Sequence, residues 1–214
     1  AAGSITVADV PYRATKYRVE PDFSSAAFPL MALAHGHGTV RVPGLASARL
    51  QGDSAVLDLL SRMGVTVREE AGDIVAHRPV GSRVTGVDVD LRDASDLVPA
   101  LAVAATAAVG TTRIRGVGFI RGKESDRISD LVEGLSILGA EAVAHDDGLS
   151  VTGGSLRPSG VLRTHHDHRL AMAFALPAAG GHTVMLDDGD VVTKSWPGYF
   201  TVMEDVLGRW SVQD

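Results

Sequence analysis

The chain has no cysteine, few aromatic side chains, no long apolar run and no excess of positive charge. Without cysteine, disulfides and thiolate chemistry are excluded, which favours a cytoplasmic protein. Apolar runs stay well short of the roughly eighteen residues that a membrane span needs, so we expect no membrane partner. The net charge of −6 argues against a nucleic-acid partner.

What the chain does have is apolar content of 45% over 214 residues, with aromatics at only 5%. That length allows one or two domains with a sizeable core. A core of small aliphatic side chains is typical of helices packed tightly on sheets, so we predict an α/β (α+β) fold.

An internal repeat organises most of the chain. Each unit has an acidic residue, an apolar helix-length run, a glycine, a short strand, a polar loop and a second helix. The acidic residues are Asp22, Asp96 and Asp167, and a glycine follows each at the same spacing, at Gly36, Gly110 and Gly181. The second helices are preceded by Gln51, Lys123 and Lys194. The units span about residues 17–80, 84–155 and 161–214.

Local patterns within the units predict their elements. Strands are expected at 38–42, 110–114 and 181–185, and second helices at 52–63, 125–138 and 198–207. Two hairpins are expected at 65–69 with 73–77 and at 141–145 with 149–152, joined by short polar turns. The third unit lacks such a hairpin. Because helix starts collect anions, symmetric packing would create an anion site where these starts converge.

The charged motifs fall at matched positions of the repeat. They are Lys123-Glu124-Ser125-Asp126-Arg127, Asp167-His168-Arg169, and Lys194 followed by Ser-Trp-Pro-Gly-Tyr-Phe. Such a density of cations around carboxyl groups suits a pocket for a small polyanion and a group that moves a proton. Ser125 and Asp126 are interpreted as helix-capping residues, and Trp196 and Tyr199 as packing residues.

These motifs, together with Val19-Glu20-Pro21-Asp22-Phe23-Ser24-Ser25 and Leu50-Gln51-Gly52-Asp53, resemble the carboxy-terminal half of the 5-enolpyruvylshikimate-3-phosphate synthases, members of the enolpyruvyl transferase family. The resemblance runs from about residue 17 to the end. It implies three βαβαββ units around pseudo-threefold symmetry, one domain of a two-domain inside-out α/β barrel. We therefore expect residues 15–214 to form this domain and residues 1–14 to be a linker from a missing amino-terminal domain.

The family's reaction moves the enolpyruvyl group of phosphoenolpyruvate to the 5-hydroxyl of shikimate 3-phosphate and releases phosphate. The resemblance implies small-molecule substrates, no cofactor, a monomer, and no activity for this half alone. It assigns catalytic roles to Asp96, Lys123, Glu124 and His168. Phosphoenolpyruvate would bind Lys123, Arg127, Arg169 and Lys194, while shikimate 3-phosphate would contact Asp96 and Lys123.

Chemistry supports these roles. Glu124 is the expected proton donor to the methylene carbon, and Asp96 the acceptor that orients the hydroxyl, although Asp96 could also cap a helix. Three clustered cations repel each other, so we expect Arg127, Arg169 and Lys194 to gather only when anions neutralise them. Adjacent residues 165–168 cannot all face one ion, so no metal site is expected.

One departure from the family and two alternatives remain. Phe119 stands four residues before Lys123, where the family commonly has a polar residue, so a hydrogen bond to the acceptor would be lost. A diverged, non-catalytic anion-binding domain is one alternative. A different enzyme on the same repeat is the other: a sister enolpyruvyl transferase acting on another acceptor, or an RNA 3′-phosphate cyclase, which the negative net charge disfavours.

Overall fold

In the computed structural model, which describes residues 4–207, the second unit contains every expected element. It runs β4 (Asp88–Asp90), η3 (Ser95–Leu97), α3 (Val98–Ala104), η4 (Ala105–Ala107), β5 (Thr111–Arg115), η5 (Gly118–Gly122), α4 (Arg127–Ile137), β6 (Glu141–His145) and β7 (Gly148–Thr152). The sheet order is β4-β5-β7-β6, with β4 parallel to β5 and the other pairs antiparallel. The βαβαββ pattern is therefore confirmed for this unit.

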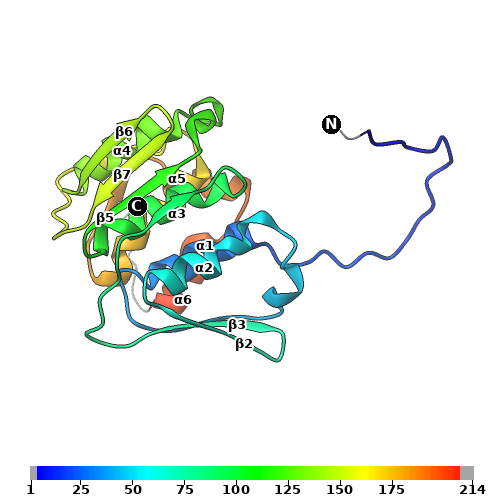
Figure 1. The fold of residues 1–214 in the computed structure, drawn as a ribbon, viewed down its shortest axis with the longest axis horizontal. Coiled ribbons are helices and arrows are strands. Elements are labelled where there is room, and N and C mark those ends of the chain that lie inside the picture. The colour runs from blue at the N-terminus through cyan, green and yellow to red at the C-terminus, as the bar shows by residue number, and fades with distance from the viewer. Residues whose placement is uncertain (1–3, 208–214) are drawn as a thin grey trace.

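The first unit has the same order but no opening strand. It runs α1 (Phe23–Ala32), β1 (Gly38–Val42), η1 (Leu45–Ala48), η2 (Gly52–Ala55), α2 (Val56–Arg62), β2 (Thr66–Glu70) and β3 (Asp73–Arg78), with sheet order β1-β3-β2. Residues 4–22 carry no regular structure, and the amino-terminal segment extends away from the body before Glu20 and Pro21 contact Gln51 (Figure 1). The expected opening strand has no neighbouring strand to pair with among the described residues, and Tyr17 and Val19 are 78% and 80% exposed.

The third unit opens with β8 (Val161–Leu162) and continues with α5 (His168–Phe174), η6 (Leu176–Gly180), β9 (Met185–Leu186), η7 (Asp190–Lys194) and α6 (Tyr199–Leu207). β8 and β9 pair in parallel. The strand predicted at 181–185 is reduced to β9, since Gly181 turns the chain at φ 83° and no hairpin pairs with β9 among the described residues. The ends of the predicted domain, residues 1–3 and 208–214, lie outside the described residues.

The hairpin turns follow local chemistry. Glu70 pairs with Asp73, which leaves Ala71 and Gly72 as a two-residue turn with φ of 52° and 89°. Two consecutive positive φ values define the turn type that matches the twist of a hairpin. Glycine adopts such values at no cost, whereas Ala71 is strained, so Gly72 makes this turn possible.

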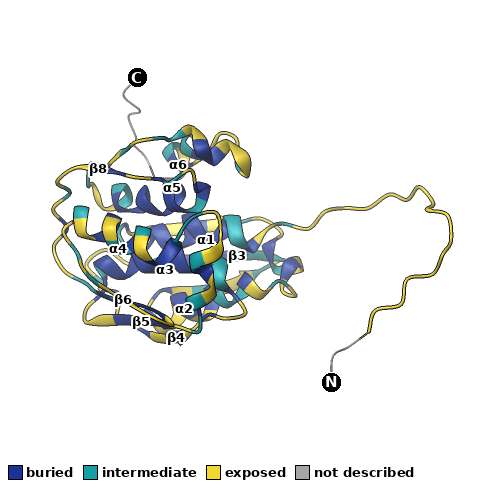
Figure 2. Cartoon of the chain, turned by 90° about the horizontal axis from the view of Figure 1, so that it is seen from above, coloured by how far each residue is buried: buried dark blue, intermediate teal, exposed yellow. Residues whose placement is uncertain are grey.

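The helices form the centre of the molecule and the sheets lie outside them (Figure 1). α1, α3 and α5 are buried almost completely, α3 packs against both of the others, and their alanines allow close approach (Figure 2). Tyr199 connects α6 to α1 by contacting Phe28 edge to face, and the centroids of the two aromatic side chains are 6.2 Å apart. Tyr199 is fully buried and donates its hydroxyl to the Met172 carbonyl, as expected for a packing residue.

Among the described residues, no helix is both long and apolar enough to cross a lipid bilayer.

Candidate active site

Helix starts from the three units meet on one side of the helical core. Asp22 caps α1 by accepting from Ser24 N at 3.1 Å and Ser25 N at 3.0 Å. Asp167 caps α5 by accepting from Arg169 N at 2.9 Å. Asp126 caps α4 in the same way through Ser129 N. These caps hold the polar loops before each helix in place, so the charged motifs project from defined positions.

Asp96 is the centre of a cluster of cations. Its carboxylate accepts from Arg127 Nη1 and from Arg169 Nη2, each at 3.0 Å, and Lys123 Nζ lies 3.5 Å away. Burial alone raises the pKa of the Asp96 carboxyl, but the charges of Arg169, Lys123 and Arg127 hold that pKa below its ordinary value. Asp96 is therefore kept ionised, in position to accept a hydrogen bond from a substrate hydroxyl.

The expected helix-capping role of Asp96 is wrong. Its carboxylate makes no capping hydrogen bond, and the turn at Ser95–Leu97 has Ala94 at its start. The residue three positions after Asp96 is Pro99, which has no N–H to donate to a capping carboxylate. The carboxylate is left free to bind the cations instead.

A buried ion pair joins the second and third units. Arg127 donates from Nε to Asp167 at 2.7 Å and from Nη2 at 3.3 Å, and its side chain is 3% exposed. Asp167 is fully buried. Because Arg127 also binds Asp96 from Nη1, three of its five N–H groups are engaged, and its burial leaves a ligand little access to the other two.

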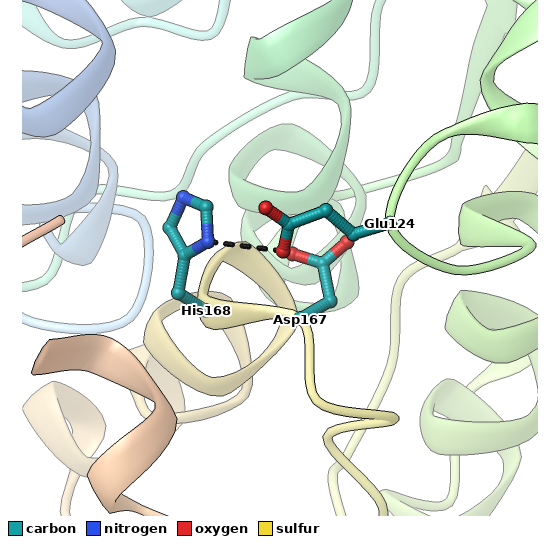
Figure 3. Close-up of side chains that lie close together, drawn as sticks. All are labelled: Glu124, Asp167 and His168. Carbon is teal, nitrogen blue, oxygen red and sulfur yellow. Dashed lines mark hydrogen bonds and ion pairs between the residues drawn. The ribbon is translucent and has the colours of Figure 1, made fainter. Parts of the chain in front are cut away.

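Glu124, His168 and Lys194 form the other half of the cluster, and Figure 3 shows Glu124 beside His168. The Nδ1 atom of His168 lies 3.2 Å from Glu124 Oε2, and Lys194 Nζ approaches the same oxygen at 3.4 Å. Lys194 also donates to the carbonyl of His166 at 2.8 Å. A carboxyl group held by an imidazole and an ammonium can exchange a proton with either of them and with a substrate.

The loop before α5 is strained. His165 and His166 are consecutive residues with φ of 52° and 57°, a conformation that costs energy for residues other than glycine. This path turns the His166 carbonyl toward Lys194. The strained backbone thus places the His166 carbonyl where it accepts from Lys194, and this hydrogen bond holds the Lys194 ammonium beside Glu124.

All seven residues predicted for the site are brought together. They are Asp96, Lys123, Glu124, Arg127, His168, Arg169 and Lys194. The expectation that substrate anions must gather the cations is wrong in part, since Asp96 and Asp167 already hold Arg127 and Arg169 together without a ligand. Carboxylates of the chain itself supply the neutralising charge.

Two functional features escaped the sequence reasoning. Asp167 is part of a charged motif but has no predicted role at the site, although its position beside Arg169 and equivalent to Asp96 in the repeat could have suggested ion pairing. Asp53 and Ser24 belong to motifs that carry the family resemblance, and they too have no predicted role at the site. Asp53 is 9% exposed, accepts a hydrogen bond from the Ser24 hydroxyl, and lies close enough to Asp96 and Arg169 for their charges to affect its ionisation.

Glu124, Asp167 and His168 place ligand atoms within 4.8 Å of one another, which is close enough to hold a metal ion (Figure 3). The donor set fits such an ion poorly. Both oxygens of Asp167 already accept from Arg127, and Arg169 N donates to one of them. A cation would have to break this buried ion pair and would lie among three other positive side chains.

Phe119 lies on η5 in the turn that leads to Lys123 and is 55% exposed. The start of α4 beyond it is held by Arg121, which binds Asp126 with both contacts at 3.1 Å and the His145 carbonyl at 3.1 Å. The turn is therefore firmly placed, and it presents an apolar ring rather than a hydrogen-bonding group.

Comparisons with known proteins give one consistent family. Residues 3–203 match the family described as EPSP synthase (3-phosphoshikimate 1-carboxyvinyltransferase). Proteins named 3-phosphoshikimate 1-carboxyvinyltransferase from Methanobrevibacter smithii and Thiobacillus denitrificans are each 38% identical to the chain. They cover 91% and 93% of it. The chain spans 43% and 47% of their lengths, about half of each relative.

Solved structures agree with this result. The EPSP synthase of Acinetobacter baumannii superimposes with a TM-score of 0.72 at 28% identity, covering 88% of the chain and 46% of that enzyme. The enolpyruvyl transferase NikO of Streptomyces tendae gives a TM-score of 0.64 at 24% identity, over 89% of the chain and 43% of NikO. At that identity, the likeness to NikO shows a shared fold alone.

Proposed function

Because the chain belongs to the EPSP synthase family, we propose that it supplies one side of an active site that transfers the enolpyruvyl group of phosphoenolpyruvate to the 5-hydroxyl of shikimate 3-phosphate. Phosphate is the second product, and the reaction belongs to the shikimate pathway of aromatic amino acid biosynthesis. One observation carries this proposal: Asp96 with its three cations lies beside a Glu124–His168–Lys194 group, so that anion binding and proton transfer share one site.

The proposed first step is addition across the enol double bond. The acceptor oxygen bonds to C2 of phosphoenolpyruvate while Glu124 delivers a proton to the methylene carbon C3. The hydroxyl proton passes to Asp96, which its cations keep ionised and oriented. Loss of phosphate from C2 and of a proton from C3 then restores the double bond in the product.

The cations of the site are proposed to bind the substrates and to position the carboxylates. We propose that Arg169 and Lys194, both more accessible than Arg127, bind the carboxylate and phosphate of phosphoenolpyruvate, and that Lys123 bridges both substrates. Arg127 is proposed to contact phosphoenolpyruvate only where the ligand replaces Asp96, and otherwise to fix Asp96 and Asp167. His168 is proposed to exchange a proton with Glu124, to which it is hydrogen-bonded.

The domain arrangement is also part of the proposal. Residues 15–214 would form one domain of a cytoplasmic, monomeric enzyme, with residues 1–14 a linker toward an amino-terminal domain that supplies the remaining substrate contacts. The length of the relatives supports this, since each is about twice as long as the matched region. Alone, the chain is expected to bind phosphoenolpyruvate weakly and to produce no phosphate.

The test is phosphate release from phosphoenolpyruvate plus shikimate 3-phosphate. The chain would be mixed with a separately produced amino-terminal half of the Thiobacillus denitrificans relative, and complex formation would be confirmed first. Activity that disappears with Glu124→Gln, but persists with the surface change Glu133→Gln, is the expected result. A stable complex without phosphate release would favour the non-catalytic anion-binding alternative.

A further inference from the structure

The first unit contributes a buried carboxyl group to the site that the proposed mechanism does not use. Asp53 is the second residue of η2, and Ser24 lies in the first turn of α1. Gly52 packs so closely on the Asp93 carbonyl that a Cβ would lie 2.5 Å from that oxygen. The start of η2 therefore packs closely against the segment that carries Asp96.

Asp53 is the carboxyl of the site with the least compensated charge. Asp96 has three cations within 3.5 Å, Asp167 pairs with Arg127, and Glu124 contacts Lys194 and His168. Asp53, which is 9% exposed, has a hydrogen bond from the neutral Ser24 hydroxyl, and no cation lies within ion-pair distance of it among the described residues.

The charged groups around Asp53 come from all three units. Asp22 at the start of α1 and Asp96 repel its negative charge, whereas Arg169 from α5 attracts it. Burial first, and then these two carboxylates, raise the pKa of Asp53, while the Ser24 hydrogen bond and Arg169 oppose the rise. The ionised form of Asp53 therefore depends on Arg169.

The site holds at least as many carboxylates as cations. Asp53, Asp96, Glu124 and Asp167 oppose the four cations Lys123, Arg127, Arg169 and Lys194. Phosphoenolpyruvate adds a carboxylate and a phosphate and engages Arg169, which weakens the attraction of that cation for ionised Asp53. A proton from solvent can offset part of the added negative charge, and it binds where the negative charge is least compensated.

We propose that Asp53 is a charge-balancing residue that takes up a proton from solvent when the anionic substrate binds beside Arg169. This inference rests on the proposed function, because it requires phosphoenolpyruvate at Arg169. The step converts one carboxylate into a carboxylic acid and involves no other bond. Asp53 acts through Arg169 and Asp96 without touching substrate.

The proposal can be tested by isothermal titration of the full 214-residue chain with phosphoenolpyruvate. Two buffers with different ionisation heats, at pH ~5, give the number of protons taken up per ligand. Wild-type chain is expected to take up about 0.3 proton more per ligand than Asp53→Asn, the most that a threefold difference in affinity allows. Protons exchanged by the ligand itself cancel in this difference. Asp58→Asn, on the exposed face of α2, is the matched control and should behave as wild type.

Affinity provides a second readout that a merely structural role would not give. Asparagine resembles the neutral acid, so Asp53→Asn should bind phosphoenolpyruvate about threefold more tightly than wild type at pH ~7, and this advantage should shrink as the pH falls through pH ~5. A Ser24→Ala variant removes the hydrogen bond that favours ionised Asp53, so its proton uptake should peak at higher pH. Circular dichroism would confirm that each variant is folded.

The outcomes separate the two proposals. Binding with the same proton uptake in wild type and Asp53→Asn, or weaker binding by Asp53→Asn at every pH, would overturn the role of Asp53 and leave the enzyme proposal intact. Absence of phosphoenolpyruvate binding by wild type would overturn the anion site itself and this inference with it. If the difference in proton uptake caused by Asp53→Asn is also seen in a Glu124→Gln background, the proton is assigned to Asp53 rather than to Glu124.

Discussion

At the scale of single residues, the carboxylates of the site organise its cations. Asp96 gathers two guanidinium groups and an ammonium, and Asp167 fixes one of those guanidinium groups from the other side. Groups of opposite charge in a partly buried site stay ionised, because each offsets the free-energy cost of taking the other out of water. The cations are thus preorganised for an anion instead of being assembled by it.

Asp167→Asn should lower the free energy of unfolding by about 3 kcal/mol, because it leaves the buried Arg127 charge with only part of its compensation. The asparagine amide oxygen can still cap α5, so loss of the cap contributes little. Urea denaturation measures the effect. Asp88→Asn, which removes an exposed pair with Arg115, is the control and should cost less than about 1 kcal/mol. A loss equal to that control would show that the buried pair is not needed.

Lys194→Ala should weaken phosphoenolpyruvate binding by more than about 1 kcal/mol, the most that an exposed charge contributes. The ammonium group is held by the His166 carbonyl and Glu124, so it is positioned before the ligand arrives. Titration calorimetry of the variant checks this. Lys16→Ala, on the extended amino-terminal segment, provides the control. Unchanged affinity would remove Lys194 from the anion site.

At the scale of elements, the position of the site depends on how closely the helices approach one another. α4 carries Arg127 at its start and α5 carries Asp167 at its cap, so the ion pair between them requires these two helices to be adjacent. Gly134 allows this approach, since a Cβ there would lie 2.2 Å from the ring of the buried Phe174.

Gly134→Ala should therefore destabilise the protein by about 1–2 kcal/mol, although alanine normally stabilises a helix relative to glycine by about 1 kcal/mol. The added methyl group must displace Phe174, which is fully buried and has no space to move. Thermal or urea unfolding gives the value, with Ser136→Ala on the exposed side of α4 as control. In a double mutant with Phe174→Leu, the combined loss should be smaller than the sum of the two single losses. Additive losses would contradict the proposed contact.

At the scale of the whole molecule, three units form a ring of helices with sheets outside it, and the junctions between units hold it together. One junction is His35, which follows α1 and donates from Nε2 to the Val103 carbonyl at the end of α3, 3.1 Å away. Burial above all, and to a lesser degree the charges of His182 and Arg78, lowers the pKa of His35 to about 4. The first and second units are therefore joined through a neutral imidazole.

Acid should weaken this junction within a defined range of pH. The pKa of His35 is about 4 in the folded chain and 6.5 for a histidine free in solution, so the unfolded chain binds the proton first as pH falls. Stability is then lost progressively from pH 6.5 to about pH 4, by about 3 kcal/mol in total. Urea denaturation at several pH values measures the slope. His35→Gln should flatten it relative to wild type, while His37→Gln, at an exposed position, should not. An unchanged slope in His35→Gln would assign the acid sensitivity to other groups.

The sequence by itself determined the repeat, the fold class, the order of the elements and the seven charged residues of the site. These follow from periodicity, glycine positions and motif spacing, which act over a few residues along the chain. The tertiary structure alone decided which carboxylate binds which cation, that Asp96 does not cap its helix, that Asp53 belongs to the site, and that residues 17–21 form no strand. Ion pairing and strand pairing depend on groups that come together only when separate units pack. No local pattern specifies those distances.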